Sequence, residues 1–321
     1  MRLAFAAAVI PAVFAAGPVL AATPVETLKI ERKTETVDIE MAYPATGIAA
    51  VDGPIADWVK GMVADFEKEA DADFASFKAD NDGEVPPWTY SLYLGFEVPR
   101  NDDRMLVFDF DESIFQGGAH PAHEIVTQNY MMPDGWEVYL PEILDGERAL
   151  RRLSALAVAD LDRQLLGPNS LSDADWIRTG AGPTWSNFQD FLLLEDKLVI
   201  RFPPYQVAAY AAGDQRVEIP LSELSGLVRK DWRAPVASFD CARAGTATEK
   251  AICSDVALAR LDRGLTDSYI MALSWADAPG KAAIRDAQRT WIAERDACGA
   301  DIGCLTAQYQ ARIRVLQTPP S

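Results

Sequence analysis

The sequence of 321 residues is short of cysteine, histidine and positive charge. It contains four cysteines, two histidines and 30 lysines and arginines against 48 aspartates and glutamates, so its net charge is −18 near neutral pH. The shortage of basic residues disfavours nucleic-acid binding, because little would neutralise the phosphates. The sequence also lacks a dinucleotide-binding fingerprint, a phosphate-binding glycine loop and a Gly-x-Ser-x-Gly nucleophile motif. We therefore predict that the protein is not an enzyme and has no catalytic residue and no cofactor.

Long apolar runs are also missing after residue 22, so we expect no integral membrane segment. The N-terminus differs, because Arg2 is followed by an apolar run over residues 3–20 and by the small residues Ala21 and Ala22. This pattern is typical of a cleavable signal peptide. We therefore predict a signal peptide over residues 1–22 and a periplasmic or secreted mature protein, in a compartment where cysteines form disulfides.

The four cysteines are gathered near the C-terminus, at Cys241, Cys253, Cys298 and Cys304. Apolar residues recur between them at helical spacing, and a helical unit this small usually needs covalent cross-links. We therefore predict a small disulfide-stapled all-α domain over residues 235–321. Four cysteines can pair in three ways, and loop closure favours the local pairs Cys241–Cys253 and Cys298–Cys304 only weakly. A zinc site is the alternative, although zinc ligands usually lie closer together in the sequence.

A specific set of residues surrounds these cysteines. It comprises Cys241, Glu249, Ile252, Cys253, Leu258, Leu261, Asp262, Tyr269, Gln288, Trp291, Arg295, Asp296, Cys298, Cys304, Leu305, Tyr309, Arg312 and Ile313. This set resembles the cysteine-stapled helical domain of the LprI family, which is associated with lysozyme inhibition. The resemblance implies a domain that binds a muramidase by protein–protein contact.

Two of these residues are candidates for contact with a partner. Trp291 lies on the apolar stripe of a predicted helix, so we expect it in the core. Arg295 lies one turn further along, and we expect it to join Gln288 and Asp296 in a polar network around Glu249 or Asp262. Contact of Arg295 with a partner is the alternative.

Residues 23–234 contain predicted strands and helices in runs, without regular alternation. We predict strands over residues 36–43, 88–98, 105–110, 125–130 and 136–140, a long helix from Pro54, a second helix over 147–166, and a later hairpin. This order favours an α+β domain built on an antiparallel sheet with helices.

The domain over residues 23–234 holds 38 acidic against 19 basic residues, whereas residues 235–321 hold ten of each. The acidic excess favours a cationic partner by electrostatic steering, with simple solubility as the alternative.

The same domain contains three short motifs. They are Gln116-Gly-Gly-Ala-His120, Trp185-Ser-Asn-Phe188, and Phe202-Pro-Pro-Tyr205 running on to Tyr210 and Gly213. These motifs are similar to the extracellular domain of the anti-sigma factor RsiV, a domain that also accompanies a family of peptidoglycan deacetylases. In RsiV this domain is a lysozyme receptor, so the resemblance implies lysozyme as a ligand.

The two histidines lie close together in the sequence, as His120 and His123, next to Glu124. With acidic residues upstream they could bind a metal. The surrounding Gly-Gly-Ala-His motif instead favours a tight turn in which His120 hydrogen-bonds to the backbone. We therefore predict no metal site, and a metal-dependent hydrolase centred on these histidines is the least favoured function.

Two other pairs also have a functional and a structural interpretation. Asp109 and Asp111 lie on one face of a predicted strand, and paired carboxylates can hydrolyse glycosides. In so acidic a protein, a solvated strand edge is the favoured explanation. Tyr205 and Tyr210 could present their rings to a sugar or a protein, but their apolar-rich segment favours packing.

Taken together, the two resemblances predict a periplasmic or secreted protein that binds lysozyme or a related cationic muramidase and inhibits it. The alternative is a module that binds peptidoglycan or maintains the cell wall. The candidate residues for partner contact, or for the signature of the fold, are His120, Tyr205, Tyr210, Trp291 and Arg295.

Overall fold

The structure, a computed structural model, describes residues 22–229, residue 232 and residues 237–317. The predicted signal peptide up to residue 21, and the predicted domain boundary between residues 234 and 235, lie outside these residues. Among the residues that the structure describes, no helix combines the length and the apolar character needed to cross a membrane.

The first part of the chain forms a six-stranded sheet in the order β1-β2-β3-β4-β5-β6. Its strands are β1 (Glu26–Lys33), β2 (Val37–Ala45), β3 (Tyr90–Asn101), β4 (Met105–Phe115), β5 (Ala122–Met131) and β6 (Trp136–Glu137). Neighbouring strands are antiparallel except for β2 and β3, which are parallel. The predicted antiparallel sheet is therefore wrong at this pair. The long helix α1 (Ala49–Asp80) connects the two strands and carries the chain back along the sheet, as parallel pairing requires.

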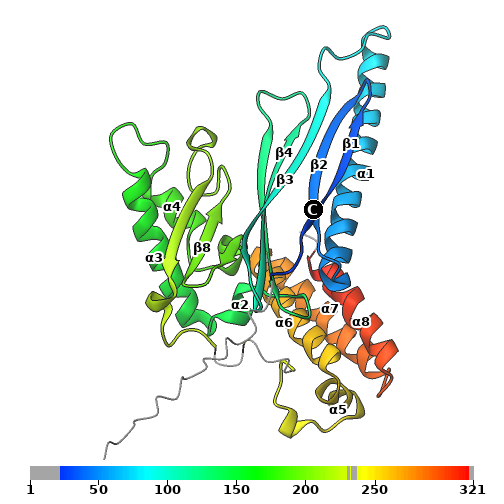
Figure 1. Cartoon of the computed structure of the whole chain (residues 1–321), viewed down its shortest axis with the longest axis vertical. Coiled ribbons are helices and arrows are strands. Elements are labelled where there is room, and N and C mark those ends of the chain that lie inside the picture. The colour runs from blue at the N-terminus through cyan, green and yellow to red at the C-terminus, as the bar shows by residue number, and fades with distance from the viewer. Residues whose placement is uncertain (1–21, 230–231, 233–236, 318–321) are drawn as a thin grey trace, which may run out of the picture.

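Helix α1 covers one face of this sheet (Figure 1). Apolar residues recur along it every three or four positions, so that one stripe faces the sheet. Alternate residues of the strands complete this core, because successive side chains point to opposite faces. The buried residues of α1 are Val51, Ile55, Val59, Val63, Phe66, Ala70 and Phe74.

The opposite face of β4 packs against a second unit. Met105 and Val107 join a separate apolar core with a three-stranded antiparallel sheet. Its strands are β7 (Phe191–Leu193), β8 (Lys197–Phe202) and β9 (Gln215–Pro220), and its helices are α2 (Leu140–Ile143), α3 (Gly146–Leu165), α4 (Ala174–Gly180) and the 3-10 turn η1 (Trp185–Phe188). Strands and helices thus form two sheets with segregated helices, and the α+β class is confirmed.

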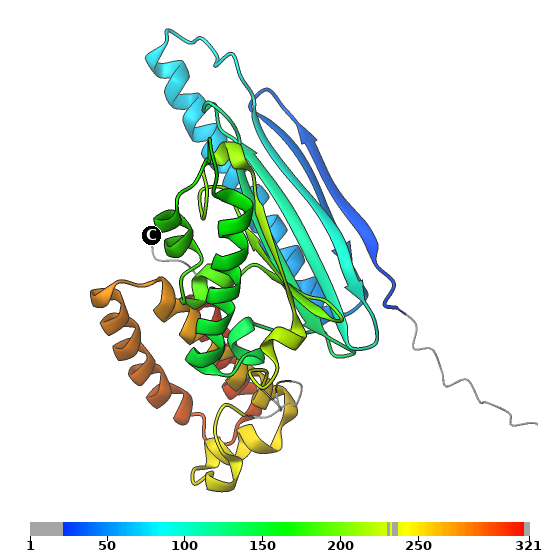
Figure 2. The ribbon, with the colours of Figure 1, turned by 90° about the vertical axis from the view of Figure 1, so that its left-hand side faces the viewer.

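The C-terminal part is all-helical, as predicted. It consists of α5 (Ala247–Ser254), α6 (Val256–Trp275), α7 (Ala278–Asp296) and α8 (Ile302–Gln317). Two disulfides join Cys241 to Cys253 and Cys298 to Cys304, which are the local pairs. The hydroxyl of Thr248 in α5 donates to the carbonyl of Gly299, so both disulfides lie at one end of the unit. Figure 2 shows these helices beside the end of the long sheet, next to the second unit.

Candidate functional site

Three of the predicted residues, far apart in the sequence, meet at one place on the surface. His120 lies in the loop between β4 and β5, and Tyr205 and Tyr210 lie in the loop between β8 and β9. The rings of His120 and Tyr210 are stacked, with centroids 3.8 Å apart and planes at 19°. The ring centroid of Tyr205 lies 5.6 Å from that of Tyr210, and its hydroxyl lies 3.4 Å from Nε2 of His120. We call these three residues the aromatic cluster.

The carbonyl of Pro121 holds the two loops together. It accepts a hydrogen bond from the hydroxyl of Tyr210 at 2.8 Å and lies 2.9 Å from Nδ1 of His120. A carbonyl oxygen has two lone pairs, so it can accept from both side chains at once. The expectation that His120 hydrogen-bonds to the backbone in a tight turn agrees with this geometry.

Tyr205 is exposed on the surface, and its backbone is strained. Its φ angle is 70°, in the left-handed region that residues other than glycine rarely adopt, and the residue is 56% exposed. The indole of Trp176 donates to the carbonyl of Tyr205 at 2.9 Å, and the amide of Tyr205 donates to the carbonyl of Ala208 at 3.0 Å. The expectation that this ring packs inside the protein is therefore wrong. Strain at an exposed aromatic residue is the kind of outlier that points to a functional role.

The backbone at Gln206, in the loop that carries the two tyrosines, lies close to the backbone at Gly180. A Cβ atom at Gly180 would lie 1.9 Å from the carbonyl oxygen of Gln206, so no larger residue fits there. The side-chain amide of Gln206 then donates to the carbonyls of Gly180 and Asn187. These contacts fix the base of the loop that carries the two tyrosines.

Three acidic residues gather around Arg201 of β8. The guanidinium of Arg201 forms ion pairs with Asp109, with Asp111 at 3.5 Å and with Asp214 at 3.0 Å. The interpretation of Asp109 as part of a solvated edge is therefore wrong, since this residue is 5% exposed. Burial raises the pKa of Asp109 more than the neighbouring Arg201 lowers it. Arg201 therefore contacts three acidic groups, of which Asp111 and Asp214 are partly exposed.

The two histidines do not converge on one point. Nε2 of His123 lies 3.7 Å from the carboxylate of Asp111, whereas the ring of His120 stacks on Tyr210. Within the residues that the structure describes, no group of three or more His, Cys, Asp or Glu side chains could hold a metal ion.

The other two candidates, Trp291 and Arg295, lie in the helical unit, away from the aromatic cluster in sequence and fold. Trp291 is buried against Tyr309, as its place on the apolar stripe predicts. Nη1 of Arg295 donates to the hydroxyl of Tyr309 at 3.1 Å, and that hydroxyl donates to Asp262 at 2.7 Å. Arg295 therefore joins an internal network, and Asp262 is one of the two partners that we predict.

The sequence prediction missed one member of this network and misplaced another. The sequence analysis names Tyr309 only as part of the LprI-like residue set, although its hydroxyl joins Arg295 to Asp262. Glu249 does not reach Arg295 by a hydrogen bond; it closes a capping box with Thr246 instead. The pattern Thr246-x-x-Glu249 before an apolar run is a signal that could have identified this cap.

Comparison with known protein families assigns three segments of the chain. Residues 241–316 match the model of the family described as "Lysozyme inhibitor LprI". Residues 30–123 match "Deacetylase PdaC", and residues 143–222 match a protein family of unknown function, DUF3298. The LprI resemblance predicted from the cysteine region is confirmed, and a PdaC-type and a DUF3298 segment precede it.

Two characterised relatives are similar to parts of the chain. "Lipoprotein LprI" of Mycobacterium tuberculosis is 34% identical over 79 residues, which are 24% of this chain and 39% of that protein. "Peptidoglycan-N-acetylmuramic acid deacetylase PdaC" of Bacillus subtilis is 23% identical over 209 residues, which are 65% of this chain and 42% of that protein. The chain thus spans about two fifths of the length of these relatives.

Two solved structures resemble the chain at low identity. A DUF3298 family protein from Pseudomonas aeruginosa PAO1 is 19% identical with a TM-score of 0.49, covering 67% of this chain and 98% of that one. A member of the same family from Bacteroides fragilis is 16% identical with a TM-score of 0.47, covering 66% of this chain and 95% of that one.

Proposed function

We propose that this chain is an exported protein that binds a lysozyme or a related cationic muramidase and inhibits it by protein–protein contact. The observation that carries the proposal is the match of residues 241–316 to the lysozyme-inhibitor family. The resemblance of the preceding segment to the extracellular domain of RsiV supports the same ligand from a second part of the chain. The two disulfides support an oxidising compartment outside the cytoplasm.

The aromatic cluster is the surface that we assign to partner contact. Tyrosine is enriched at the energetic centres of protein interfaces, because its ring buries a large area and loses little conformational entropy. His120, Tyr205 and Tyr210 are held by stacking and by shared hydrogen bonds, so their rings are arranged before a partner arrives. Such preorganisation lowers the entropic penalty of binding.

Electrostatics support a cationic partner at this surface. The segment over residues 23–234 carries an excess of 19 acidic residues, since it holds 38 acidic and 19 basic ones. Asp109, Asp111 and Asp214 gather around Arg201, and Asp214 lies in the same β8–β9 loop as the two tyrosines. Long-range attraction would speed the encounter and orient the partner, while the aromatic rings would supply the contact area.

No step of catalysis is part of this proposal. The paired carboxylates Asp109 and Asp111 both form ion pairs with Arg201, and we assign them to the electrostatics of this surface. Inhibition would follow from covering the muramidase cleft.

The test is a lysis assay with a suspension of bacterial cell walls and a cationic lysozyme. We expect the purified mature protein to slow the fall in turbidity, in proportion to its concentration, until the enzyme is saturated. Unchanged lysis at a several-fold molar excess would contradict the proposal. Retention of the protein on purified peptidoglycan, with lysis unchanged, would favour the wall-binding alternative instead.

A further inference from the structure

Three tryptophans from separate parts of the chain line one hollow of about 430 Å³. Trp58 comes from α1, Trp185 from η1 and Trp275 from the end of α6, so the hollow lies where the long sheet, the second unit and the helical unit meet. Its volume falls in the range of pockets that bind small molecules.

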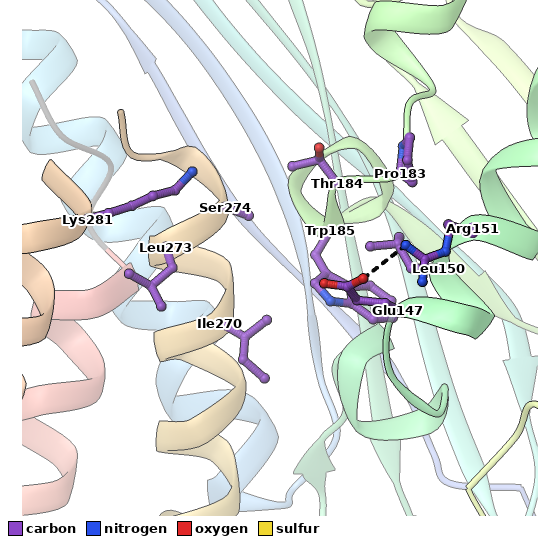
Figure 3. A pocket seen from close by; sticks show the side chains of 10 residues that line it. All are labelled: Glu147, Leu150, Arg151, Pro183, Thr184, Trp185, Ile270, Leu273, Ser274 and Lys281. Atoms are coloured by element: carbon purple, nitrogen blue, oxygen red, sulfur yellow. Dashed lines mark hydrogen bonds and ion pairs between the residues drawn. The ribbon is translucent and has the colours of Figure 1, made fainter. Parts of the chain in front are cut away.

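Trp185 also lines a second hollow of about 360 Å³ between α3 and α6. Figure 3 shows the second hollow, with Ile270 and Leu273 on one side and Trp185 and Leu150 on the other. The lining of the second hollow includes Lys281 and Arg151, and the lining of the first does not. The two hollows therefore differ in chemistry, and the first one, which we call the tryptophan pocket, is the subject of the inference.

The polar groups of the tryptophan pocket include amides, carboxyl groups, a phenol and the hydroxyls of Thr127 and Ser268. The amides belong to Gln128, Gln189 and Gln317. The hydroxyl of Tyr139 donates to Glu137 at 2.8 Å and accepts from the amide of Gln317 at 2.9 Å. This chain of bonds ties the last turn of α8 to the segment after β6.

The charge of the lining disfavours an anionic ligand. Among the described residues that line the tryptophan pocket there is no lysine, arginine or histidine, whereas Glu137 and Asp190 are both present. Burial raises the pKa of Asp190 to about 7 and also raises the pKa of Glu137. The pocket therefore offers hydrogen bonds without a positive charge, which suits a neutral polar ligand.

We propose that the tryptophan pocket binds a neutral N-acetylated sugar. The faces of a sugar ring carry C–H groups that pack on a flat apolar surface, and indole rings provide such surfaces. The rim of the ring carries hydroxyls, which carboxyl and amide groups can both donate to and accept from. An acetamido group has one N–H donor and one C=O acceptor, and a glutamine side chain matches both. The site is separate from the aromatic cluster and does not rest on muramidase binding.

The test uses the full mature chain and N,N′-diacetylchitobiose, followed by tryptophan fluorescence and by calorimetry. We expect saturable binding that Trp275→Ala and Gln189→Ala each weaken by about tenfold or more, which corresponds to about 1.4 kcal/mol. Trp88→Ala is the matched control, because this partly exposed tryptophan lies near the other end of α1 against Phe77. The control should bind the sugar like the wild type. The unfolding temperature of each variant verifies that the fold is intact.

A second comparison tests the charge argument. N-Acetylmuramic acid carries a carboxylate that N-acetylglucosamine lacks, so we expect it to bind the tryptophan pocket several-fold more weakly. The inference is overturned if no saturable binding is found. It is also overturned if Gln189→Ala and Trp275→Ala bind the disaccharide like the wild type, or if the anionic sugar binds at least as tightly as the neutral one.

Discussion

The imidazole of His120 lies flat against the phenol ring of Tyr210, although the two residues belong to different loops of two different sheets. The nearby hydrogen bond from Tyr210 to Pro121 joins residues 89 positions apart. This contact fastens the tip of the β4–β5 hairpin to the second unit, and it places Tyr205 at the edge of the joined loops. The geometry of the proposed partner surface therefore depends on the docking of both units.

The disulfides should contribute unequally to the stability of the helical unit. Cys241 and Cys253 are 12 residues apart, whereas Cys298 and Cys304 are 6 apart. In the loop-entropy model the longer loop stabilises by roughly 0.6 kcal/mol more, since its length is double. We expect the Cys241→Ala/Cys253→Ala variant to lose roughly 2–4 kcal/mol, and the other double variant somewhat less. Denaturant unfolding of both variants measures the difference, and equal or reversed losses would contradict it.

The stability of the helical unit should also depend strongly on the buried hydrogen-bond network around Asp262. Its carboxylate accepts from the amide and hydroxyl of Ser238 and from the hydroxyl of Tyr309, and it lies 4.0 Å from Nη1 of Arg295. Asp262→Ala would remove the acceptor of both Ser238 and Tyr309 inside the core, so we expect a loss of roughly 3–5 kcal/mol.

A matched control for Asp262 is available on the surface of α7. Asp286 pairs with Arg289 at 2.6 Å, but both side chains are largely exposed. Asp286→Ala should therefore change stability by less than about 0.5 kcal/mol. Equal losses in the two variants, measured by thermal unfolding, would show that the buried network has no special weight.

Stability should fall as the pH rises from about 5 to 8, through carboxyl groups that keep their protons when folded. Burial, with Glu124 nearby, raises the pKa of Glu112 from 4.5 to about 7, and burial raises the pKa of Glu142 to about 7 as well. The folded state then holds more protons than the unfolded state in this window, so stability is full below the ordinary pKa and is lost above about 7.

The variant Glu112→Gln tests this dependence, because its amide resembles the protonated acid. We expect the fall in unfolding free energy between pH 5 and pH 8 to shrink by roughly 2–3 kcal/mol. Glu97→Gln, at an exposed position of β3, serves as the control and should keep the fall of the wild type. The prediction is wrong if both variants keep the same slope.

Association with a cationic lysozyme should depend strongly on salt. Screening shortens to about 8 Å near 0.15 M ionic strength, so the attraction of the acidic segment over residues 23–234 fades beyond that distance. We expect the association rate to fall steeply between low and physiological salt, and the dissociation rate to change little. Surface-based kinetics at several salt concentrations measure both rates. An association rate that does not change with salt would show that electrostatic attraction does not speed the encounter.

Local patterns in the sequence predict much of this fold. The helical period of the C-terminal quarter marks the helices, and alternation marks most strands. Strand β1 was missed because its residues are mostly exposed and charged on an edge, so they show little alternation. The parallel pairing of β2 with β3 was missed because it depends on how α1 crosses the sheet, which no local pattern records.

The candidate site shows the same limit. His120, Tyr205 and Tyr210 were each identified from motifs, but their meeting depends on contacts across 85 and 89 positions of the sequence. The positive φ angle of Tyr205 could not be predicted from the residue type, because tyrosine rarely adopts such an angle. The tryptophan pocket was not predicted, because its lining comes from three parts of the chain that only the folded molecule brings together.

The most direct test of the proposed function is the affinity of a cationic lysozyme for Tyr205→Ala. This substitution removes the exposed ring of Tyr205 from the aromatic cluster, and Leu28→Ala is the control because it truncates an exposed residue on the far edge strand β1. Binding is measured by surface-based kinetics at one salt concentration, with the thermal unfolding of each variant as a check on its fold. We expect Tyr205→Ala to weaken binding by about tenfold or more, as the loss of an interface centre does, and Leu28→Ala to bind like the wild type. Wild-type affinity of Tyr205→Ala, or no binding of lysozyme to the unaltered protein, would contradict the account.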